Sequence, residues 1–292
     1  MSIKGKLIIA GGSIDVGNSI ANEKEIKEVN RNYFYKYGIL KNIIEESKNK
    51  EESRIEIITT ASKIPKEVSE MYIRAFKLLG ATNVAHLPIN SRIEANDPTN
   101  LQRLTQANAV LFTGGDQLLL TSVIGGTPFQ QILLDKYHHE EFLYAGTSAG
   151  AAAVSSNMIY QGNSSDAFLK GLVELNSGLG LIDSIIVDTH FIQRGRIGRL
   201  FQVVVGNPMK IGIGLGEDTG LIITDNNDTM IAIGSGSIIL VDGRQITDTN
   251  LTQVDIGKPI SISHLITHVM TQNDVFYFKK NKIIIKNSQY NN

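Results

Sequence analysis

Five short apolar runs divide the first half of the chain, and each ends beside a glycine, threonine or proline. Short apolar runs bounded by such residues are typical of buried strands. We therefore predict strands at residues 7–10, 54–59, 83–87, 109–113 and 142–145.

Between these runs, apolar residues recur at a helical spacing in polar sequence. Residues 23–50 are charged and predict an amphipathic helix or a helix pair. Residues 67–79 predict another helix, with Pro65 near its start and Gly80 as its stop, and residues 101–106 predict a short one. Strands that alternate with helices indicate an α/β protein whose mostly parallel central sheet is covered by helices on both faces.

The pattern changes after residue 220. Residues 221–224, 229–233, 237–241 and 282–286 are rich in β-branched residues and are separated by Asp, Asn and Gly turns. They predict C-terminal β-hairpins and edge strands that complete the same domain. Without a linker or repeat, we expect residues 1–292 to form a single domain with a frayed tail at 287–292.

Three glycine-marked loops follow predicted strands, at residues 11–12, 114–115 and 146–150. Ligands bind beyond the carboxyl ends of the strands in a parallel sheet, so these loops should share one functional edge. Residues 146–150 read Gly-Thr-Ser-Ala-Gly and fit the nucleophile elbow, a tight strand-to-helix turn that exposes a serine hydroxyl. An ordinary small-residue turn around Ser148 is the alternative.

Composition narrows the classes of function. The 292 residues are 42% hydrophobic and 20% charged, as in ordinary globular proteins, and the net charge of -1 favours neither nucleic acid nor an anionic membrane as a partner. The chain has no cysteine, which excludes disulfides, thiolate metal sites and a cysteine nucleophile. The N-terminal apolar run is too short for a signal peptide, and no run approaches the length of a membrane span, so we expect a cytoplasmic protein.

A serine nucleophile needs a base within hydrogen-bond reach and a third group that orients the base. His190 follows the strand-like run 184–189 and is placed to reach Ser148, although a packed or surface histidine would read the same way. His138 and His139 lie in a charged stretch that is typical of a solvated helix end. The remaining three form a loose metal-ligand pattern without a carboxylate motif: His86, His264 and His268.

The third group of such a triad is expected in the carboxylate pair Glu217 and Asp218. Glycine alternates with apolar residues at 211–216, so this pair should end a tightly packed strand. The spacing leaves the choice between the two open, and two acidic residues that cap a turn are the alternative.

Polar residues near the same edge are candidates for substrate binding. Arg194, Arg196 and Arg199 follow His190 and do not share one helical face, which points either to an acidic group in the substrate or to local ion pairs. Asp116 and Gln117 could bind substrate, and the Gly114–Gly115 loop could present N–H groups to an oxyanion, or it could be a plain turn.

Several motifs in one order identify a family. Residues 61–65 (ASKIP), 112–117 (FTGGDQ), 145–151 (AGTSAGA), 188–191 (DTHF), 194–200 (RGRIGRL), 216–219 (GEDT), 234–236 (GSG) and 242–243 (DG) together resemble the cyanophycinases. These belong to a serine peptidase group that also contains the α-aspartyl dipeptidases. The likeness runs from about residue 7 to residue 243.

The resemblance implies a cytoplasmic, cofactor-free and usually dimeric enzyme without a metal. Cyanophycinases cut cyanophycin, a poly-aspartate backbone with arginine on each side-chain carboxyl, into β-Asp-Arg dipeptides. The fold implied is similar to that of class I glutamine amidotransferases. An α-aspartyl or isoaspartyl dipeptidase, and a non-catalytic ligand-binding member of the fold, are the alternative functions.

The resemblance also implies a role for each residue at a matching position. Ser148 would be the nucleophile, His190 the general base and Glu217 the group that orients it. The oxyanion would be bound by backbone N–H groups of Ala149 and the Gly114–Gly115 loop. The substrate-binding residues predicted in this way and from the chain itself are Asp116, Gln117, Asp188, Arg194, Arg196 and Arg199.

Two positions depart from the family pattern. Ile14 stands where relatives carry a glutamate, and Gly216 stands where they often carry an aspartate. Neither belongs to the expected triad, but both changes could alter how substrate is handled.

Overall fold

The computed structural model of the chain describes residues 2–17 and 33–286. Its largest element is a nine-stranded sheet with β1 at its centre. On one side of β1 the strands are parallel, which confirms the α/β class and the parallel core predicted from the sequence. In spatial order this half consists of β1 (Lys6–Ala10), β5 (Leu143–Thr147), β4 (Ala109–Phe112), β2 (Ile55–Ile58) and β3 (Val84–His86).

Helices cover both faces of this parallel half. Alternate residues of a strand point to opposite faces, and the side chains of β1 accordingly divide between two cores: Ile8 packs with Leu40 and Phe76, whereas Leu7 and Ile9 pack with Leu133. The first core lies under α2 (Ile39–Glu46) and α3 (Pro65–Leu78), and the second under α4 (Pro98–Gln106), α5 (Gln117–Ile124) and α6 (Pro128–His139).

Several helix boundaries differ from the predicted ones. The predicted helix at 101–106 begins earlier, at Pro98, because the Asp97 side chain accepts hydrogen bonds from the N–H groups of Thr99 and Asn100. Helix α5 was not predicted, since its sequence is apolar nearly all round and shows no helical stripe. Part of the predicted segment 23–50 and the whole tail 287–292 lie outside the described residues.

Antiparallel strands extend the sheet on the other side of β1. This half consists of β10 (Thr219–Thr224), β11 (Thr229–Gly234), β16 (Val275–Tyr277) and β17 (Lys282–Ile284). It contains the predicted strands at 221–224, 229–233 and 282–286, whereas β16 was not predicted. The turn between β10 and β11 is formed by Asp225, Asn226 and Asn227, all with positive φ, which suits short polar residues.

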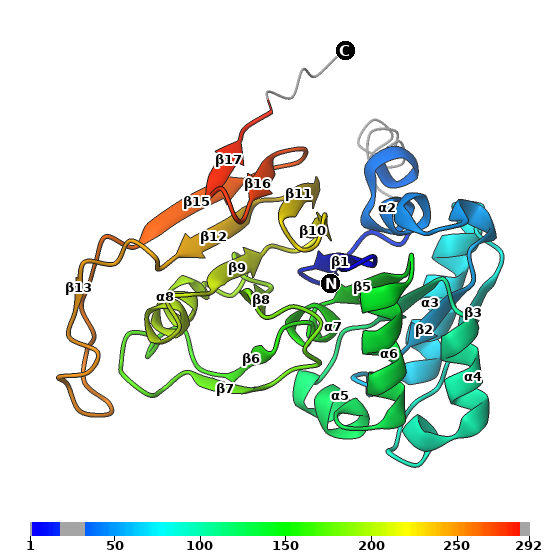
Figure 1. Cartoon of the computed structure of the whole chain (residues 1–292), viewed down its shortest axis with the longest axis horizontal. Helices are drawn as coiled ribbons and strands as arrows, with labels where there is room; N and C mark the ends of the chain where they lie inside the picture. Colours follow the sequence, from blue (N-terminus) through cyan, green and yellow to red (C-terminus); the bar gives the residue numbers. More distant parts are fainter. Residues whose placement is uncertain (1, 18–32, 287–292) are drawn as a thin grey trace, which may run out of the picture.

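A second, four-stranded sheet lies beside the first. Its order is β15 (Ile266–Met270), β12 (Ile238–Asp242), β9 (Ile211–Leu215) and β8 (Ile185–Thr189). Helix α8 (Ile197–Gly206) packs against it, so close to Gly212 that a Cβ there would lie 2.6 Å from Val204. Figure 1 shows β12, β15 and α8 on the left and α3, α4 and α6 on the right, with β1 and β5 between them. The apolar pattern did not predict that the C-terminal strands divide between two sheets.

The remaining elements are short. Strands β6 (Asn157–Gln161) and β7 (Glu174–Ser177) form one hairpin, and β13 (Asp248–Thr249) and β14 (Ile262–Ser263) pair in an arm that extends from the second sheet. Further short helices include η1 (Lys50–Glu52), η2 (Glu94–Asn96) and α7 (Ala149–Ala152).

A buried carboxylate lies near the outer strand β3. Glu56 of β2 has a fully buried side chain and accepts hydrogen bonds from the guanidinium groups of Arg54 and Arg103. Arg103 also donates to the backbone carbonyl of His86 at 2.8 Å. A charge that is buried away from water must be paired. Arg54 and Arg103 pair the charge of Glu56, and Arg103 also links α4 to the edge of the sheet.

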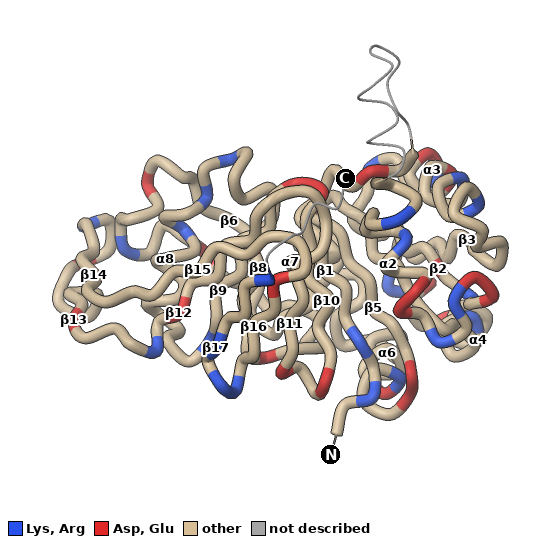
Figure 2. The backbone as a smooth tube through the Cα atoms, turned by 90° about the horizontal axis from the view of Figure 1, so that it is seen from above, with Lys and Arg blue, Asp and Glu red and all other residues tan. Residues whose placement is uncertain are grey.

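Charges of both signs are spread over the molecule. Figure 2 shows basic residues (blue) and acidic residues (red) interspersed on both the left and the right side of the molecule. Within residues 2–17 and 33–286, no helix combines the length and the apolar character needed to cross a membrane.

The turn from β5 into α7 is packed against β4, and this contact can be tested. A Cβ at Gly150 would lie 2.3 Å from the carbonyl oxygen of Phe112. We expect Gly150→Ala to lower the free energy of unfolding by about 1–3 kcal/mol, because overpacking forces the backbone apart. Urea denaturation measures the loss.

Gly206→Ala is the matched control, since nothing lies within 4 Å of a Cβ at Gly206. We expect no loss of stability in the control. Equal stability of the two variants would contradict the close approach of α7 to β4.

Candidate active site

The three glycine-marked loops meet at one edge of the large sheet, as predicted. Strand β5 pairs in parallel with β1 on one side and with β4 on the other. The carboxyl ends of these three strands therefore lie next to one another, and the loops after Ala10, Phe112 and Thr147 form a common surface.

Ser148 occupies the tight turn between β5 and α7. Its backbone has φ of 51° and ψ of -108°, a conformation that L residues rarely adopt. The hydroxyl of the buried Tyr144 donates to the carbonyl of Gly150 at 2.7 Å and so supports the turn from below. Strained backbone of this kind persists only where the surrounding structure enforces it.

Ser148, His190 and Glu217 form one hydrogen-bonded chain. The Ser148 Oγ lies 3.0 Å from His190 Nε2, and His190 Nδ1 lies 2.7 Å from Glu217 Oε1. A carboxylate accepts hydrogen bonds only, so it favours the tautomer with a proton on Nδ1 and leaves Nε2 free to accept the serine proton. Between the two acidic residues left open by the spacing, it is Glu217 that contacts the histidine.

The backbone at the end of β1 hydrogen-bonds to the backbone at or next to each of these three residues. The carbonyl of Ala10 accepts from the N–H of Ser148 at 2.9 Å, and that of Gly11 accepts from the N–H of His190 at 3.0 Å. The next carbonyl, that of Gly12, accepts from the N–H of Asp218, the neighbour of Glu217, at 3.0 Å. Three consecutive carbonyls thus fix the serine on the large sheet relative to the histidine and the carboxylate, which follow β8 and β9 of the second sheet.

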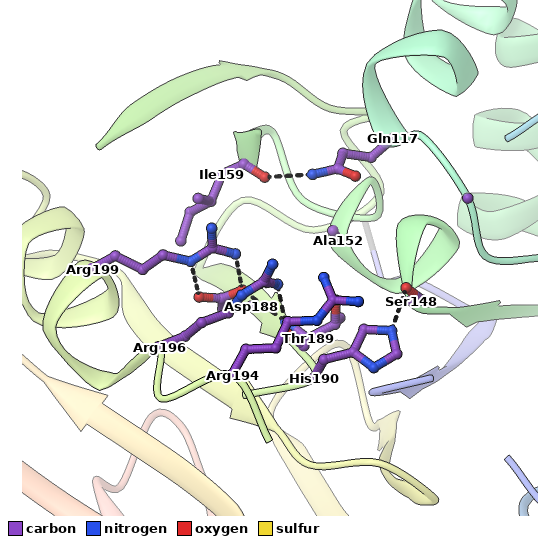
Figure 3. A pocket seen from close by; sticks show the side chains of 11 residues that line it. Gln117, Ser148, Ala152, Ile159, Asp188, Thr189, His190, Arg194, Arg196 and Arg199 are labelled. Atoms are coloured by element: carbon purple, nitrogen blue, oxygen red, sulfur yellow. Dashed lines mark hydrogen bonds and ion pairs between the residues drawn. The ribbon is translucent and has the colours of Figure 1, made fainter. Parts of the chain in front are cut away.

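A cavity of about 230 Å³ opens beside Ser148 and His190. The other residues that line it come from the loop after β4, α5, α7, β6, β8 and α8 with its preceding loop (Figure 3): Gly115, Gln117, Ala152, Ile159, Asp188, Thr189, Arg194, Arg196 and Arg199. The structure thus brings most of the predicted site residues to a single cavity.

Two of the three arginines are paired with one buried carboxylate. Arg199 binds Asp188 through two hydrogen bonds, from Nε to Oδ2 at 2.6 Å and from Nη2 to Oδ1. Arg196 donates to Asp188 Oδ1 at 3.3 Å and to the carbonyl of Thr189 at 2.8 Å. Asp188 is only 2% exposed and is the one acidic residue among those that line the cavity. Its carboxylate therefore contacts two guanidinium groups of the protein and the N–H of Thr189.

The cavity carries an excess of positive charge. Arg194 is exposed, and its guanidinium has no hydrogen-bond or ion-pair partner among the described residues. Burial lowers the pKa of Arg196 below its usual value, and Arg199 and Arg194 act in the same direction while Asp188 opposes them. Three guanidinium groups against one carboxylate favour an anionic ligand.

Backbone N–H groups lie close to the serine. A Cβ at Gly114 would lie 3.2 Å from the Cβ of Ser148, and a Cβ at Gly115 would meet the carbonyl of Ala61 at 1.9 Å, so only glycine fits at Gly115. Ala149 is the first residue of α7, where a backbone N–H has no acceptor within the helix. Backbone N–H groups that have no acceptor can bind negative charge.

Asp116 and Gln117 have different surroundings, although they are neighbours. The Asp116 carboxylate caps α5 by accepting from the N–H groups of Leu118 and Leu119, and it is not among the residues that line the cavity. Gln117 lines the cavity and donates to the carbonyl of Ile159 at 3.2 Å, on the side away from His190 (Figure 3).

Sequence reasoning missed three lining residues: Ala152, Ile159 and Thr189. Thr189 lies between two predicted site residues and could have been inferred from the strand that carries them. The backbone carbonyl of Ile159 accepts a hydrogen bond from Gln117, and a pattern of side chains cannot predict such a backbone contact.

The two departures from the family pattern lie outside this lining. Ile14 is 7% exposed and packs in the core with Ala10 and Phe34. Gly216 lies against the loop after β1, where a Cβ at Gly11 would be 2.0 Å from the Gly216 carbonyl oxygen.

Two of the histidines in the loose metal-ligand pattern hydrogen-bond to threonine hydroxyls instead. His86 Nε2 lies 2.8 Å from Thr59 Oγ1, and His264 Nδ1 lies 2.8 Å from Thr247 Oγ1. In the part of the chain that the structure describes, no group of three or more His, Asp or Glu residues is arranged to hold a metal ion.

Comparisons with known proteins agree with one another. The model of "Peptidase family S51" matches residues 31–231. A cyanophycinase of Trichormus variabilis is 35% identical over 230 residues, which cover 79% of this chain and 77% of the relative. A cyanophycinase of Synechococcus elongatus is 32% identical over 229 residues, which cover 78% and 71%.

The fold also has a counterpart among solved structures. A peptidase from an acI-B1 Actinobacterium superposes with a TM-score of 0.65 at 19% identity and covers 95% of this chain and 98% of its own. At this identity the likeness shows the fold alone.

The buried ion pairs of Asp188 can be tested by removing the charge. We expect Asp188→Asn to lower the free energy of unfolding by about 2–4 kcal/mol, because Arg199 would keep a buried charge without a counter-ion. Asp183→Asn is the control, since Asp183 pairs with Lys210 through a side chain that is 80% exposed, and a surface pair contributes about 0–1 kcal/mol. Urea denaturation of both variants measures the difference, and equal losses would contradict the pairing described.

Proposed function

The chain belongs to peptidase family S51, and on this premise we propose that it is a serine-type exopeptidase that hydrolyses cyanophycin to β-Asp-Arg dipeptides. The observation that carries the proposal is the hydrogen-bonded chain from Ser148 through His190 to Glu217, beside a cavity rich in arginine. The relatives that are 32–35% identical over most of this chain bear the name cyanophycinase.

Ser148 is the nucleophile in this mechanism. His190 Nε2 accepts the proton of the serine hydroxyl as Oγ attacks the carbonyl carbon of the scissile bond. Glu217 keeps the imidazole oriented and stabilises the positive charge that forms on it. His190 then donates the proton to the leaving amine, which leaves an acyl-enzyme that water hydrolyses by the same route.

The strain at Ser148 fits the role of a nucleophile elbow. The turn directs the hydroxyl toward His190 and places it next to N–H groups of Ala149 and the Gly114–Gly115 loop. We assign these groups to the oxyanion hole, where preorganised donors stabilise the tetrahedral intermediate.

The arginines bind carboxylate groups of the substrate. Arg194 has no protein partner among the described residues, so its guanidinium is available to a ligand. Arg196 and Arg199 add positive charge, and Asp188 serves substrate binding through the two arginines that it holds in place. Gln117 supplies an amide to the opposite side of the cavity, and Asp116 supports it as the cap of α5.

The family resemblance supports a proposal about location and assembly. We propose a cytoplasmic enzyme that works as a homodimer and needs no metal or cofactor. Sedimentation velocity of the purified protein tests the dimer, and a monomer at micromolar concentration would contradict it.

The nucleophile is tested with Ser148→Ala. We expect the variant to melt at the same temperature as the wild type and to lose at least about 10⁴-fold in the rate of clearing of insoluble cyanophycin, because no acyl-enzyme can form. Turbidity follows the clearing, and mass spectrometry identifies β-Asp-Arg among the products.

Ser122→Ala, at an exposed serine of α5, is the control and should clear the polymer at the wild-type rate. Failure of the folded wild-type protein to clear the polymer would reject cyanophycin as the substrate. Cleavage of aspartyl or isoaspartyl dipeptides instead would then identify a dipeptidase.

Substrate recognition is tested with Arg194→Gln. We expect kcat/KM to fall by about 10-fold to 100-fold, because a charge-assisted hydrogen bond to the substrate is lost. The control is Arg74→Gln, at an exposed arginine of α3, which should leave kcat/KM unchanged. Wild-type kinetics in Arg194→Gln would remove this residue from the substrate-binding set.

A further inference from the structure

Asp218 follows the proposed triad residue Glu217 and has an unusual backbone. Its φ is 46°, in the left-handed region that few residues other than glycine, asparagine and aspartate adopt readily. Its N–H donates to the carbonyl of Gly12 at 3.0 Å. The chain therefore turns sharply at Asp218 and contacts the loop after β1 as it turns.

The carboxylate of Asp218 ties two further segments together. Oδ1 accepts from the N–H of Asp15 at 3.0 Å, and Oδ2 accepts from the hydroxyl of Ser235 at 2.7 Å. The backbone carbonyl of Asp218 accepts from the N–H of Ser235 at 2.8 Å. Burial raises the pKa of Asp218, an effect to which Asp15 adds, and the two donors oppose it by favouring the ionised form.

The loop fixed in this way, residues 11–15, lies directly on His190. A Cβ at Gly12 would lie 2.5 Å from His190 Cε1 and 2.6 Å from Nε2, so the glycine backbone packs against the edge of the ring that faces Ser148. The loop also holds the backbone of His190 through the carbonyl of Gly11. Movement of this loop would move the ring.

We propose that Asp218 is a positioning residue that holds His190 and Glu217 in the geometry for proton transfer. Its backbone N–H and its carboxylate both hydrogen-bond to the loop 11–15, which packs against His190. Its backbone is also joined directly to Glu217. This inference rests on the proposed function, since it assigns His190 as the general base. Asp218 does not line the cavity and is not expected to touch substrate.

Aspartate meets both requirements of this position, which are a left-handed backbone and a side chain that accepts two hydrogen bonds. Glycine would accept the left-handed backbone but would provide no acceptor. Asparagine tolerates the same φ and keeps one acceptor for the N–H of Asp15, but its amide nitrogen cannot accept the proton of Ser235. The two variants therefore separate the backbone requirement from the side-chain contacts.

The experiment compares Asp218→Gly and Asp218→Asn with the wild type on cyanophycin. We expect Asp218→Gly to lower kcat by about 10-fold to 100-fold with KM within about twofold, because a small displacement of a catalytic group slows chemistry without weakening binding. Asp218→Asn should fall between Asp218→Gly and the wild type, and it supplies the test if the glycine variant does not fold.

Asp274→Asn is the matched control. Asp274 lies in the loop before β16 and is also buried, at 2% exposure. Its carboxylate accepts from the N–H of Thr271 in that loop and from the N–H of Lys286 after β17. We expect this variant to lose stability as Asp218→Asn does and to keep the wild-type kcat. Equal losses of kcat in the two variants would show a general structural effect and overturn the proposal.

A second readout needs no substrate. The proton between His190 Nδ1 and Glu217 should give a low-field resonance in the proton spectrum, which His190→Gln assigns by removing it. We expect the resonance to shift or broaden in Asp218→Gly and to stay unchanged in Asp274→Asn. A wild-type resonance together with a wild-type kcat in Asp218→Gly would overturn the role of Asp218.

The same readout separates this proposal from the proposed function. If the wild-type protein leaves cyanophycin intact, the substrate assignment fails, and the resonance still decides whether Asp218 orders His190 and Glu217.

Discussion

Three consecutive backbone carbonyls at the end of β1 set the geometry on which this site depends. Those of Ala10, Gly11 and Gly12 accept from the N–H groups of Ser148, His190 and Asp218. The serine follows a strand of the large sheet, whereas the other two follow strands of the small one, so these bonds join the two sheets at the site. A Cβ at Gly11 would lie 2.0 Å from the Gly216 carbonyl oxygen, which explains why this crossing point requires glycine.

The cavity is positively charged because three arginines and only one carboxylate line it. Asp188 neutralises part of the charge of Arg196 and Arg199 and holds both guanidinium groups at defined positions. Arg194 is left without a counter-ion in the described structure. Groups fixed before a ligand arrives cost no rearrangement when it binds. Under the proposed function, the buried carboxylate would therefore prepare the cavity for anionic substrate groups.

The sequence alone could predict the parallel strands, the shared edge of the three glycine loops and the approach of His190 to Ser148, because each depends on local apolar runs and on short motifs. It could not choose between Glu217 and Asp218 by spacing, since the choice depends on which side chain the left-handed turn directs toward His190. The cap that the Asp116 carboxylate forms is local, but the apolar sequence of α5 showed no helical stripe and so hid the helix that it begins. The backbone contribution of Ile159 was also out of reach, because it is decided by packing between segments that are distant in the sequence. The division of the C-terminal strands between two sheets has the same cause: β12 pairs with β9, not with its neighbour β11, and no local pattern encodes that choice.

Charged side chains lie at both outer strands of the large sheet, where they hinder the addition of a further strand. Strand β3 pairs with β2 through the N–H of Leu87 and the carbonyl of Ile57, so the carbonyl of His86 faces outward, where Arg103 covers it. At the opposite edge, β17 begins with Lys282 and is flanked by further lysines. Charged side chains at an edge discourage the addition of a strand from another molecule. Two copies of this chain are thus discouraged from joining their large sheets edge to edge.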